Sequence, residues 1–205
     1  MPTESAQTYV YIGGMTEGLM SGTGKLYLVS HDGPAHYRAE TFETGRKGLK
    51  VYEGQFVNGL KHGSGIQFED GRKVYEGGFS NDVRSGAGTL FHATTGHRVY
   101  QGEFADGVAS GRGTEYSEYG VRIYEGTFAQ GQRDGSGTEY AGTVMLYQGQ
   151  FKNGLRHGVG TEYAAGVRVY AGEFAAGKRE GRGTEYDYYG RVIYEGMYLN
   201  GQRVT

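Results

Sequence analysis

The strongest constraint on the fold of this chain is a tract that recurs every 23 to 25 residues. Each copy opens with a tyrosine, and the opening tyrosines are Tyr52, Tyr75, Tyr100, Tyr124, Tyr147, Tyr170 and Tyr194. A fixed period of this length is typical of a stack of small supersecondary units, each packed only against its neighbours. The repeat therefore argues against a globular domain built around one enzyme cleft.

Several further positions of the repeat hold the same residue types when they are counted from the opening tyrosine. Glycine stands at positions two, eleven and thirteen, and an aromatic residue stands at positions four and sixteen. Position seven is glycine in six of the seven copies, the exception being Asp82. In the copy that begins at Tyr52, these residues are Gly54, Phe56, Gly59, Gly63, Gly65 and Phe68. So many positions in register indicate a true structural repeat.

The composition fits an ordered array better than a disordered low-complexity chain. There are 40 glycines among 205 residues, but disordered glycine-rich segments lack aromatic residues. This chain has 19 tyrosines and 9 phenylalanines, and most of them occupy repeat positions. Its 37% apolar content is low for one deep core, but sufficient for thin units that bury their faces against each other.

Each repeat is predicted to be a β-hairpin. Tyrosine, glycine and aromatic residue alternate at positions zero, two and four, which places them on one face of a strand. Residues 58–63 carry turn signals, a second strand is expected over residues 64–68, and tight turns are expected at residues 70–71 and 165–166. The strand glycines are expected to lie beneath a neighbouring aromatic ring.

The predicted fold is all-β: an elongated single-layer array of about nine antiparallel β-hairpin repeats. The array is expected over residues 11–203, and its repeats begin near residues 11, 34, 52, 75, 100, 124, 147, 170 and 194. The repeat near residue 34 is degenerate, and the one at Tyr194 is a half repeat with a first strand and no second. The chain opens almost directly on a repeat, which is compatible with a fragment of a longer array.

The tract Tyr-Glu-Gly-x-Phe-x-Asn-Gly-x-x-His-Gly-x-Gly at residues 52–65 resembles the signature of MORN repeats (membrane occupation and recognition nexus). The copy at residues 147–160 departs from the tract only at Gln148. The resemblance covers nearly the whole chain, and it is greatest to the all-repeat cytoskeletal MORN scaffolds of protozoan parasites. It implies antiparallel homodimers, cytoskeletal protein partners, and a cytoplasmic place at the membrane–cytoskeleton boundary.

A line of basic residues at position nine is the most suggestive chemical feature. Its members are Lys61, Arg84, Arg133, Arg156, Arg179 and Arg203, and Ala109 is the one gap. Regularly spaced cations of this kind can bind a phosphoinositide headgroup or an acidic protein partner. The alternative is a structural role, in which the cations are solvated or pair with the repeat-spaced glutamates Glu115, Glu139, Glu162 and Glu185.

The half repeat at the end of the chain is the predicted dimer interface. Tyr194, Met197, Tyr198 and Leu199 are expected to form a final strand with no following partner in the chain. An open edge rich in apolar side chains can pair with another strand, and two copies can bury it around a two-fold axis. A frayed, unpaired terminus is the alternative.

Other functional classes receive little support from the sequence. The formal net charge of −2 argues against a nucleic-acid binder, and no serine, histidine and acid arrangement points to catalysis. No cofactor or metal is expected, because there is no cysteine and the pairs His31/His36 and His92/His97 have no strand-face spacing. The leading hypothesis is a non-enzymatic structural scaffold that homodimerises, and the alternative is a peripheral phospholipid-binding module that uses the arginine edge.

Overall fold

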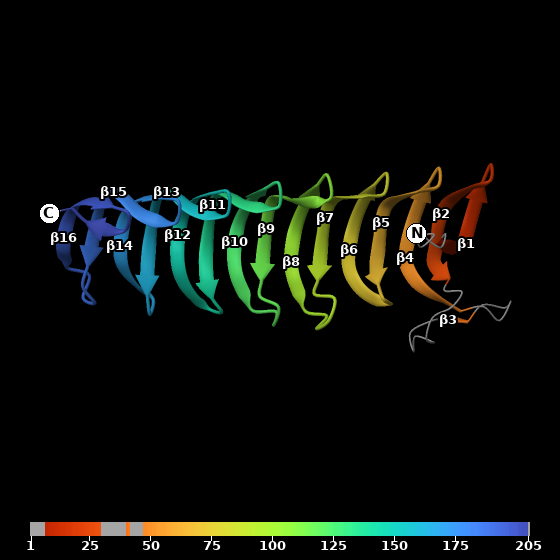
Figure 1. Cartoon of the computed structure of the whole chain (residues 1–205), viewed down its shortest axis with the longest axis horizontal. Helices are drawn as coiled ribbons and strands as arrows, with labels where there is room; N and C mark the ends of the chain where they lie inside the picture. The colour runs from red at the N-terminus through yellow and green to blue at the C-terminus, as the bar shows by residue number, and fades with distance from the viewer. Residues whose placement is uncertain (1–6, 30–39, 42–46, 205) are drawn as a thin grey trace, which may run out of the picture. The chain divides into compact units, whose positions relative to one another are not determined.

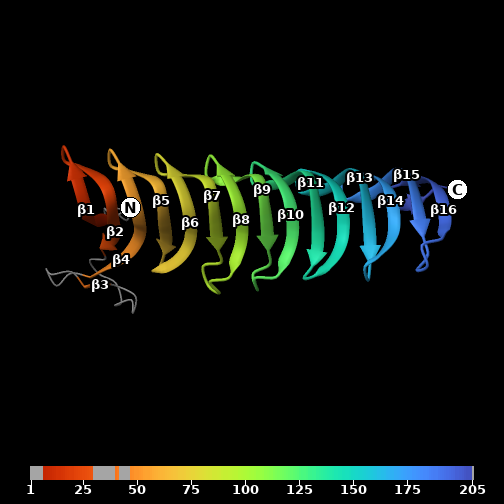
Figure 2. The same ribbon diagram turned by 180° about the vertical axis from the view of Figure 1, so that it is seen from behind.

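The computed structural model describes residues 7–29, 40–41 and 47–204. All regular secondary structure in these residues is β-strand, as predicted, and the chain divides into an N-terminal unit, residues 1–98, and a C-terminal unit, residues 99–205. In each unit, antiparallel strands form an open sheet that is one layer thick (Figures 1 and 2). The prediction of single-layer hairpins is therefore confirmed for each unit.

The N-terminal unit contains three hairpins in its described residues. Its strands are β1 (Thr8–Thr16), β2 (Leu19–Val29), β3 (Glu40–Thr41), β4 (Lys47–Val57), β5 (Leu60–Glu69), β6 (Arg72–Ser80) and β7 (Val83–Phe91). They pair in the order β1–β2–β4–β5–β6–β7, and the short β3 pairs with the beginning of β4.

The C-terminal unit contains five hairpins, and each strand pairs with the next one in the chain. Its strands are β8 (Arg98–Ala105), β9 (Val108–Tyr116), β10 (Arg122–Ala129), β11 (Gln132–Ala141), β12 (Val144–Lys152), β13 (Leu155–Ala164), β14 (Val167–Ala175), β15 (Lys178–Tyr186), β16 (Val192–Leu199) and β17 (Gln202–Arg203). All pairings are antiparallel, so neighbouring strands alternate in direction.

The described residues thus form eight hairpins, close to the expected nine repeats. Most of the degenerate repeat expected near residue 34 lies outside the described residues, since only 40–41 and 47–51 of that stretch are described. There, β2 pairs directly with β4. The prediction that the last repeat has no second strand is wrong, because the two-residue β17 folds back on β16 and pairs Arg203 with Tyr198.

The turn within each repeat is shorter than predicted. Residues 58–63 were expected to form the turn, but the second strand, β5, already begins at Leu60. The turn consists of Asn58 and Gly59 alone, with φ angles of 51° and 82°. Two successive positive φ angles are characteristic of the type I′ hairpin turn, which asparagine and glycine adopt at low cost. The expected tight turns at residues 70–71 and 165–166 have the same pair of positive φ angles.

Gly63, which resembles a turn residue in the sequence, instead forms a bulge inside β5. Gly54 pairs with Gly65 and Phe56 pairs with Lys61, so one residue of β4 faces three residues of β5. The backbone absorbs this difference at Gly63, whose φ of 61° is in the left-handed region. The hydroxyl of Tyr52 donates a hydrogen bond of 3.2 Å to the carbonyl of Gln55, the residue of β4 at the bulge.

The opening tyrosines lie flat across the glycines of their own hairpin. A Cβ atom on Gly160 would lie 2.2 Å from the hydroxyl of Tyr147, and one on Gly149 would lie 2.4 Å from it. Gly149 and Gly160 pair across β12 and β13, so one ring covers both backbones. The prediction that the strand glycines lie beneath aromatic rings is confirmed.

These tyrosines and the position-four aromatics form a continuous core within each unit, which we call the aromatic ladder. Within each unit, the opening tyrosines contact the aromatic ring of their own repeat and that of the next repeat, edge to face. In the C-terminal unit, for example, Tyr147 contacts Phe151 at 5.2 Å and Phe174 at 5.0 Å between ring centroids. Both rings of such a pair are buried, so the ladder supplies the hydrophobic contact between successive hairpins.

Within each unit, a backbone hydrogen bond also links a hairpin to the one before it. The N–H at position seven, in the turn, donates to the carbonyl at position nine of the preceding repeat. Examples are Gly154 to Arg133 and Gly177 to Arg156, both at 2.9 Å. The same bond joins Gly59 to Met20 in the N-terminal unit. The turn of one repeat is therefore held by the second strand of its predecessor.

The contact between ring and glycine predicts the effect of a single methyl group. Gly160→Ala would place its Cβ against the Tyr147 ring, and we expect a loss of about 1–3 kcal/mol, seen as a lower midpoint of urea unfolding. In a Tyr147→Leu background the same substitution should cost much less, because the ring that opposes the methyl group is absent. Equal costs in both backgrounds would contradict the proposed contact.

Candidate functional site

The basic residues at position nine all lie on the face of the sheet that carries the aromatic ladder. Position nine pairs across the hairpin with the aromatic at position four, as Arg156 does with Phe151. Each cation therefore lies over the ring of its own opening tyrosine. The distances to the ring centroid are 5.5 Å for Lys61, 4.9 Å for Arg84, 4.6 Å for Arg133, 4.5 Å for Arg156, 4.3 Å for Arg179 and 4.6 Å for Arg203. These are cation–π contacts.

In the C-terminal unit the arginines also form a continuous chain of ion pairs, which we call the charge ladder. Arg133, Arg156 and Arg179 each bridge the glutamate at position fifteen of the preceding repeat and the one of their own repeat, and Arg203 forms an ion pair with Glu185 of the preceding repeat. Arg156, for example, contacts Glu139 through Nε at 2.8 Å and Glu162 through Nη1 at 2.8 Å. The ladder runs through Glu115, Arg133, Glu139, Arg156, Glu162, Arg179, Glu185 and Arg203. The structural alternative given for the position-nine residues accounts for these four arginines.

The pKa of Glu185 reflects its place at the end of the charge ladder. Burial raises this pKa, but the hydrogen bond from Arg203 and the charges of Arg203 and Arg179 outweigh burial and lower it overall. A carboxyl group whose pKa is lowered by folding stabilises the folded state above its unfolded pKa. That contribution is lost as the pH falls through the lowered pKa.

The charge ladder is absent from the N-terminal unit. Position fifteen holds Gln67 in one repeat and Leu90 in the next, where the C-terminal repeats have glutamate. Arg84 consequently donates to the amide oxygen of Gln67, through Nε at 3.2 Å and Nη2 at 2.9 Å. Among the described residues, no carboxylate lies within ion-pair distance of Lys61 or Arg84.

The four residues predicted to form a dimer interface differ in their exposure. Tyr198 is buried, with only 2% of its surface exposed, and packs between the rings of Tyr170 and Tyr194. Met197 and Leu199 are exposed, at 48% and 58%, and Tyr194 is half-buried. Tyr194 donates a hydrogen bond to the Val204 carbonyl at 3.2 Å, so the tail after β17 covers part of this edge.

The sequence analysis did not identify a second group of exposed apolar residues beside these. Tyr188, Tyr189, Val192 and Ile193 are all exposed, the two tyrosines at 74% and 79%. The loop that carries the tyrosines is longer than a two-residue turn. It is held by Asp187, whose carboxylate accepts hydrogen bonds from the Tyr189 and Arg191 N–H groups, both at 2.9 Å. The signal was the Asp-Tyr-Tyr-Gly sequence in place of a two-residue turn.

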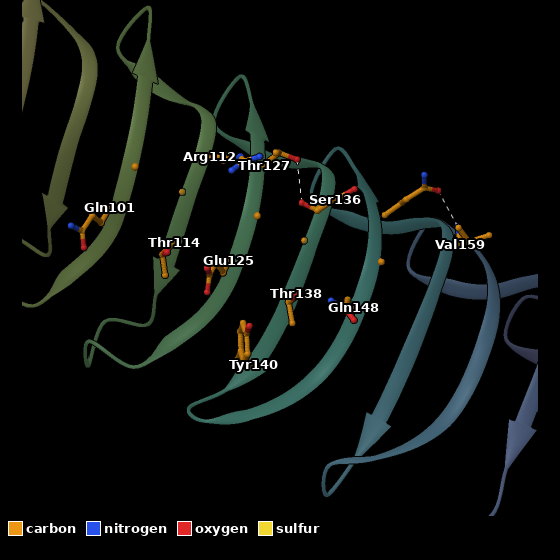
Figure 3. A pocket seen from close by; sticks show the side chains of 16 residues that line it. Gln101, Arg112, Thr114, Glu125, Thr127, Ser136, Thr138, Tyr140, Gln148 and Val159 are labelled. Atoms are coloured by element: carbon orange, nitrogen blue, oxygen red, sulfur yellow. Dashed lines mark hydrogen bonds between the residues drawn. The ribbon is translucent and has the colours of Figure 1, made fainter. Parts of the chain in front are cut away.

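The opposite face of the C-terminal sheet forms a shallow polar groove (Figure 3). Positions one and fourteen alternate across its strands, so that Thr138 of β11 lies between Glu125 of β10 and Gln148 of β12. In the same groove the Gln150 side chain accepts a hydrogen bond of 3.0 Å from the Val159 N–H. The sequence analysis did not single out this face, although its threonines recur at position fourteen.

The histidines do not gather into a site within the described residues. His92 accepts a hydrogen bond from the Thr95 N–H at 3.3 Å in the loop after β7. His31 and His36 lie outside the described residues. Across residues 7–29, 40–41 and 47–204, no three histidine, cysteine, aspartate or glutamate side chains are close enough to hold a metal ion.

Comparison with protein-family models decides the identity of the repeat. The model described as the MORN repeat matches residues 11–33, 52–71, 75–94, 100–118, 124–142, 147–168 and 170–188, which is well over half of the chain. The chain belongs to the MORN repeat family. No curated protein matches it. In the part of the chain that is described, no helix has the length and apolar character needed to cross a membrane.

The MORN repeat positions can now be assigned physical roles. The tyrosine, the glycines and the position-four aromatic belong to the aromatic ladder and the hairpin backbone, so they are used by the architecture. The histidine of the tract, His62 or His157, follows the position-nine cation directly and lies at the bulge. The apolar C-terminal group and the cations Lys61 and Arg84 of the N-terminal unit have no such role in the repeat architecture.

Removal of one charge-ladder arginine should be costly. Arg156→Gln takes one cation from both Glu139 and Glu162, and we expect a loss of about 1–3 kcal/mol in stability. Arg168→Gln is the matched control, because Arg168 is exposed and stacks on Tyr186 at 3.9 Å. The difference between the two midpoints of urea unfolding should shrink in high salt. An equal effect of both substitutions would contradict the ladder's role.

The buried tyrosines predict alkaline unfolding. Burial raises the pKa of Tyr52, Tyr100, Tyr124, Tyr147 and Tyr170 to about 12. The unfolded chain loses these protons near pH 10, so above that pH the unfolded state binds fewer protons and stability falls as the pH rises. The midpoint of urea unfolding, followed by circular dichroism, should be constant between about pH 7 and pH 10 and fall steeply toward about pH 12. A constant midpoint over the whole range would refute this.

Proposed function

We propose that this protein is a non-enzymatic structural scaffold that homodimerises through its C-terminal repeat and binds other proteins through the surfaces of its MORN repeats. The repeat residues that recur most strictly are occupied by packing and by the hairpin backbone, as the burial of the aromatic ladder illustrates. A repeat array of this kind offers regular surfaces to partners instead of a single reaction centre.

The observation that carries the dimer proposal is the gathering of exposed apolar side chains on the last hairpin. The group consists of Tyr188, Tyr189, Val192, Ile193, Met197 and Leu199. Exposed apolar side chains in this number on one hairpin and its loop often mark a protein interaction site. The proposed interface therefore keeps Met197 and Leu199 of the four predicted residues and adds Tyr188, Tyr189, Val192 and Ile193.

The backbone of β16 supports the same proposal. One edge of β16 pairs with β15, and on the other edge β17 pairs only with Tyr198 and Leu199. Within the described residues, no strand lies along that other edge at residues 192–196. An exposed edge with apolar flanks can accept a second strand, and two identical edges related by a two-fold axis would cover each other.

The cellular setting is part of the proposal. The resemblance to cytoskeletal MORN scaffolds supports cytoskeletal protein partners and a cytoplasmic location at the boundary of the membrane and the cytoskeleton. The absence of cysteine from all 205 residues is compatible with a reducing compartment. The alternative function, phospholipid binding along the arginine edge, gains less support. In the C-terminal unit every position-nine arginine already has a glutamate partner.

The dimer can be tested by measuring molar mass with light scattering and analytical ultracentrifugation at micromolar concentration. We expect the intact chain to have the mass of a dimer, and Ile193→Glu combined with Met197→Glu to have that of a monomer. The matched control is Leu155→Glu, an equally exposed apolar residue on β13. It should leave the dimer intact. A monomeric intact chain would refute the dimer, and loss of the dimer in the control would refute the assignment of its interface.

A further inference from the structure

The charge ladder shows what fits between two position-nine cations. In the C-terminal unit the carboxylate of Glu139 lies between Arg133 and Arg156, at 3.1 Å from the first and 2.8 Å from the second. The same arrangement recurs at Glu162, between Arg156 and Arg179. Each gap between successive cations is thus filled by one carboxylate from the chain itself.

The equivalent gap in the N-terminal unit has the cations but lacks the carboxylate. Lys61 of β5 and Arg84 of β7 flank Gln67, a neutral side chain in the place of glutamate. Gln67 offers Arg84 only an amide oxygen. The carboxylate on the far side of Arg84 is also missing, because Leu90 pairs with Tyr75 where glutamate pairs in the other unit. The carboxylate of Asp82 accepts a hydrogen bond from the Lys61 backbone N–H at 2.9 Å and makes no ion pair with either cation.

These groups remain accessible. Lys61, Gln67 and Arg84 are half-buried, and among the described residues no second layer covers them, because the described strands of the N-terminal unit form a single layer (Figure 2). The two cations are held over the rings of Tyr52 and Tyr75, so their positions are already fixed. A carboxylate that arrives between them does not need to order two free side chains.

We propose that Lys61 and Arg84 bind an acidic segment of a partner protein, whose glutamate or aspartate side chains supply the carboxylates that the N-terminal unit lacks. The proposal rests on the scaffold function proposed above and names the chemistry of one of its partners. It also reduces the six-residue basic line of the sequence analysis to two residues. The other four cations are neutralised within the chain.

A protein carboxylate fits this site better than a membrane surface does. The two cations lie two strands apart, or about 10 Å, and each lies over a tyrosine ring, at 5.5 Å and 4.9 Å from the ring centroid. Each basic residue near an anionic membrane contributes about 1 kcal/mol, so two of them do not hold a protein there. The ladder itself shows that carboxylates bind these positions.

The test uses the full chain and a fluorescein-labelled peptide of alternating glutamate and threonine, with binding followed by fluorescence anisotropy. A peptide with glutamine in place of glutamate is the first control. We expect the acidic peptide alone to bind, and Arg84→Gln to weaken binding about tenfold. Gln67→Glu should weaken it at least as much, because the chain would then supply its own carboxylate to both cations.

The matched control for Gln67→Glu is Gln148→Glu, which adds the same charge at position one, where Glu53, Glu76 and Glu125 stand in other repeats. It should leave peptide affinity within about twofold of the unmodified chain. If Gln148→Glu weakens binding as much as Gln67→Glu, the effect is one of net charge and the proposal fails. It fails also if the unmodified chain binds neither peptide or both equally.

Vesicles of phosphatidylcholine, with and without phosphatidylinositol bisphosphate, form the last arm of the test. Sedimentation with the anionic vesicles that depends on Arg84, without binding of the acidic peptide, would overturn the proposal in favour of a membrane ligand. Molar mass measured on the same samples separates the two proposals. If the chain is monomeric and binds the peptide, the homodimer proposal is refuted and the acidic-partner proposal stands. If the chain is dimeric and does not bind the peptide, only the acidic-partner proposal is refuted.

Discussion

The structure depends on one contact, a tyrosine ring that lies across two paired glycines. The ring of Tyr147 covers Gly149 and Gly160, its edges and faces meet Phe151 and Phe174, and Arg156 lies over it. Its hydroxyl donates to the carbonyl of residue 150, at the bulge. One residue therefore joins the two strands of a hairpin, the next hairpin and the charged surface, which explains why the tyrosine and its glycines recur so strictly.

The fold could be predicted from the sequence because this contact requires the same residue types at the same positions of every repeat. The alternation of Tyr52, Gly54 and Phe56 follows from the two-residue period of a strand, and the turn sequences mark the hairpins. The extent of the second strand could not be predicted in the same way. Glycine is common in turns, but Gly63 forms a bulge. Whether a glycine forms a turn or a bulge at this point depends on how the strand pairs with its neighbour.

The candidate site was less predictable, because its properties depend on pairs that are distant in the sequence. The line of cations at position nine is visible in the sequence, but its neutralisation depends on glutamates 17 or 18 residues earlier, such as Glu139 for Arg156 and Glu115 for Arg133. The sequence offered these pairs as an alternative and could not decide between the two interpretations. In the C-terminal unit the register of the sheet places each position-nine arginine beside a glutamate, and Lys61 and Arg84 are the exceptions.

The hydrogen bond between successive repeats gives the array a direction. Within each unit, a turn N–H uses a carbonyl that the preceding hairpin has already placed, as Gly177 uses Arg156, so a finished hairpin is a template for the one that follows it. A chain emerging from the ribosome can order its hairpins in the sequence in which they are made. Evolution can also lengthen or shorten such a protein by whole repeats, since every new junction reuses the same donor and acceptor.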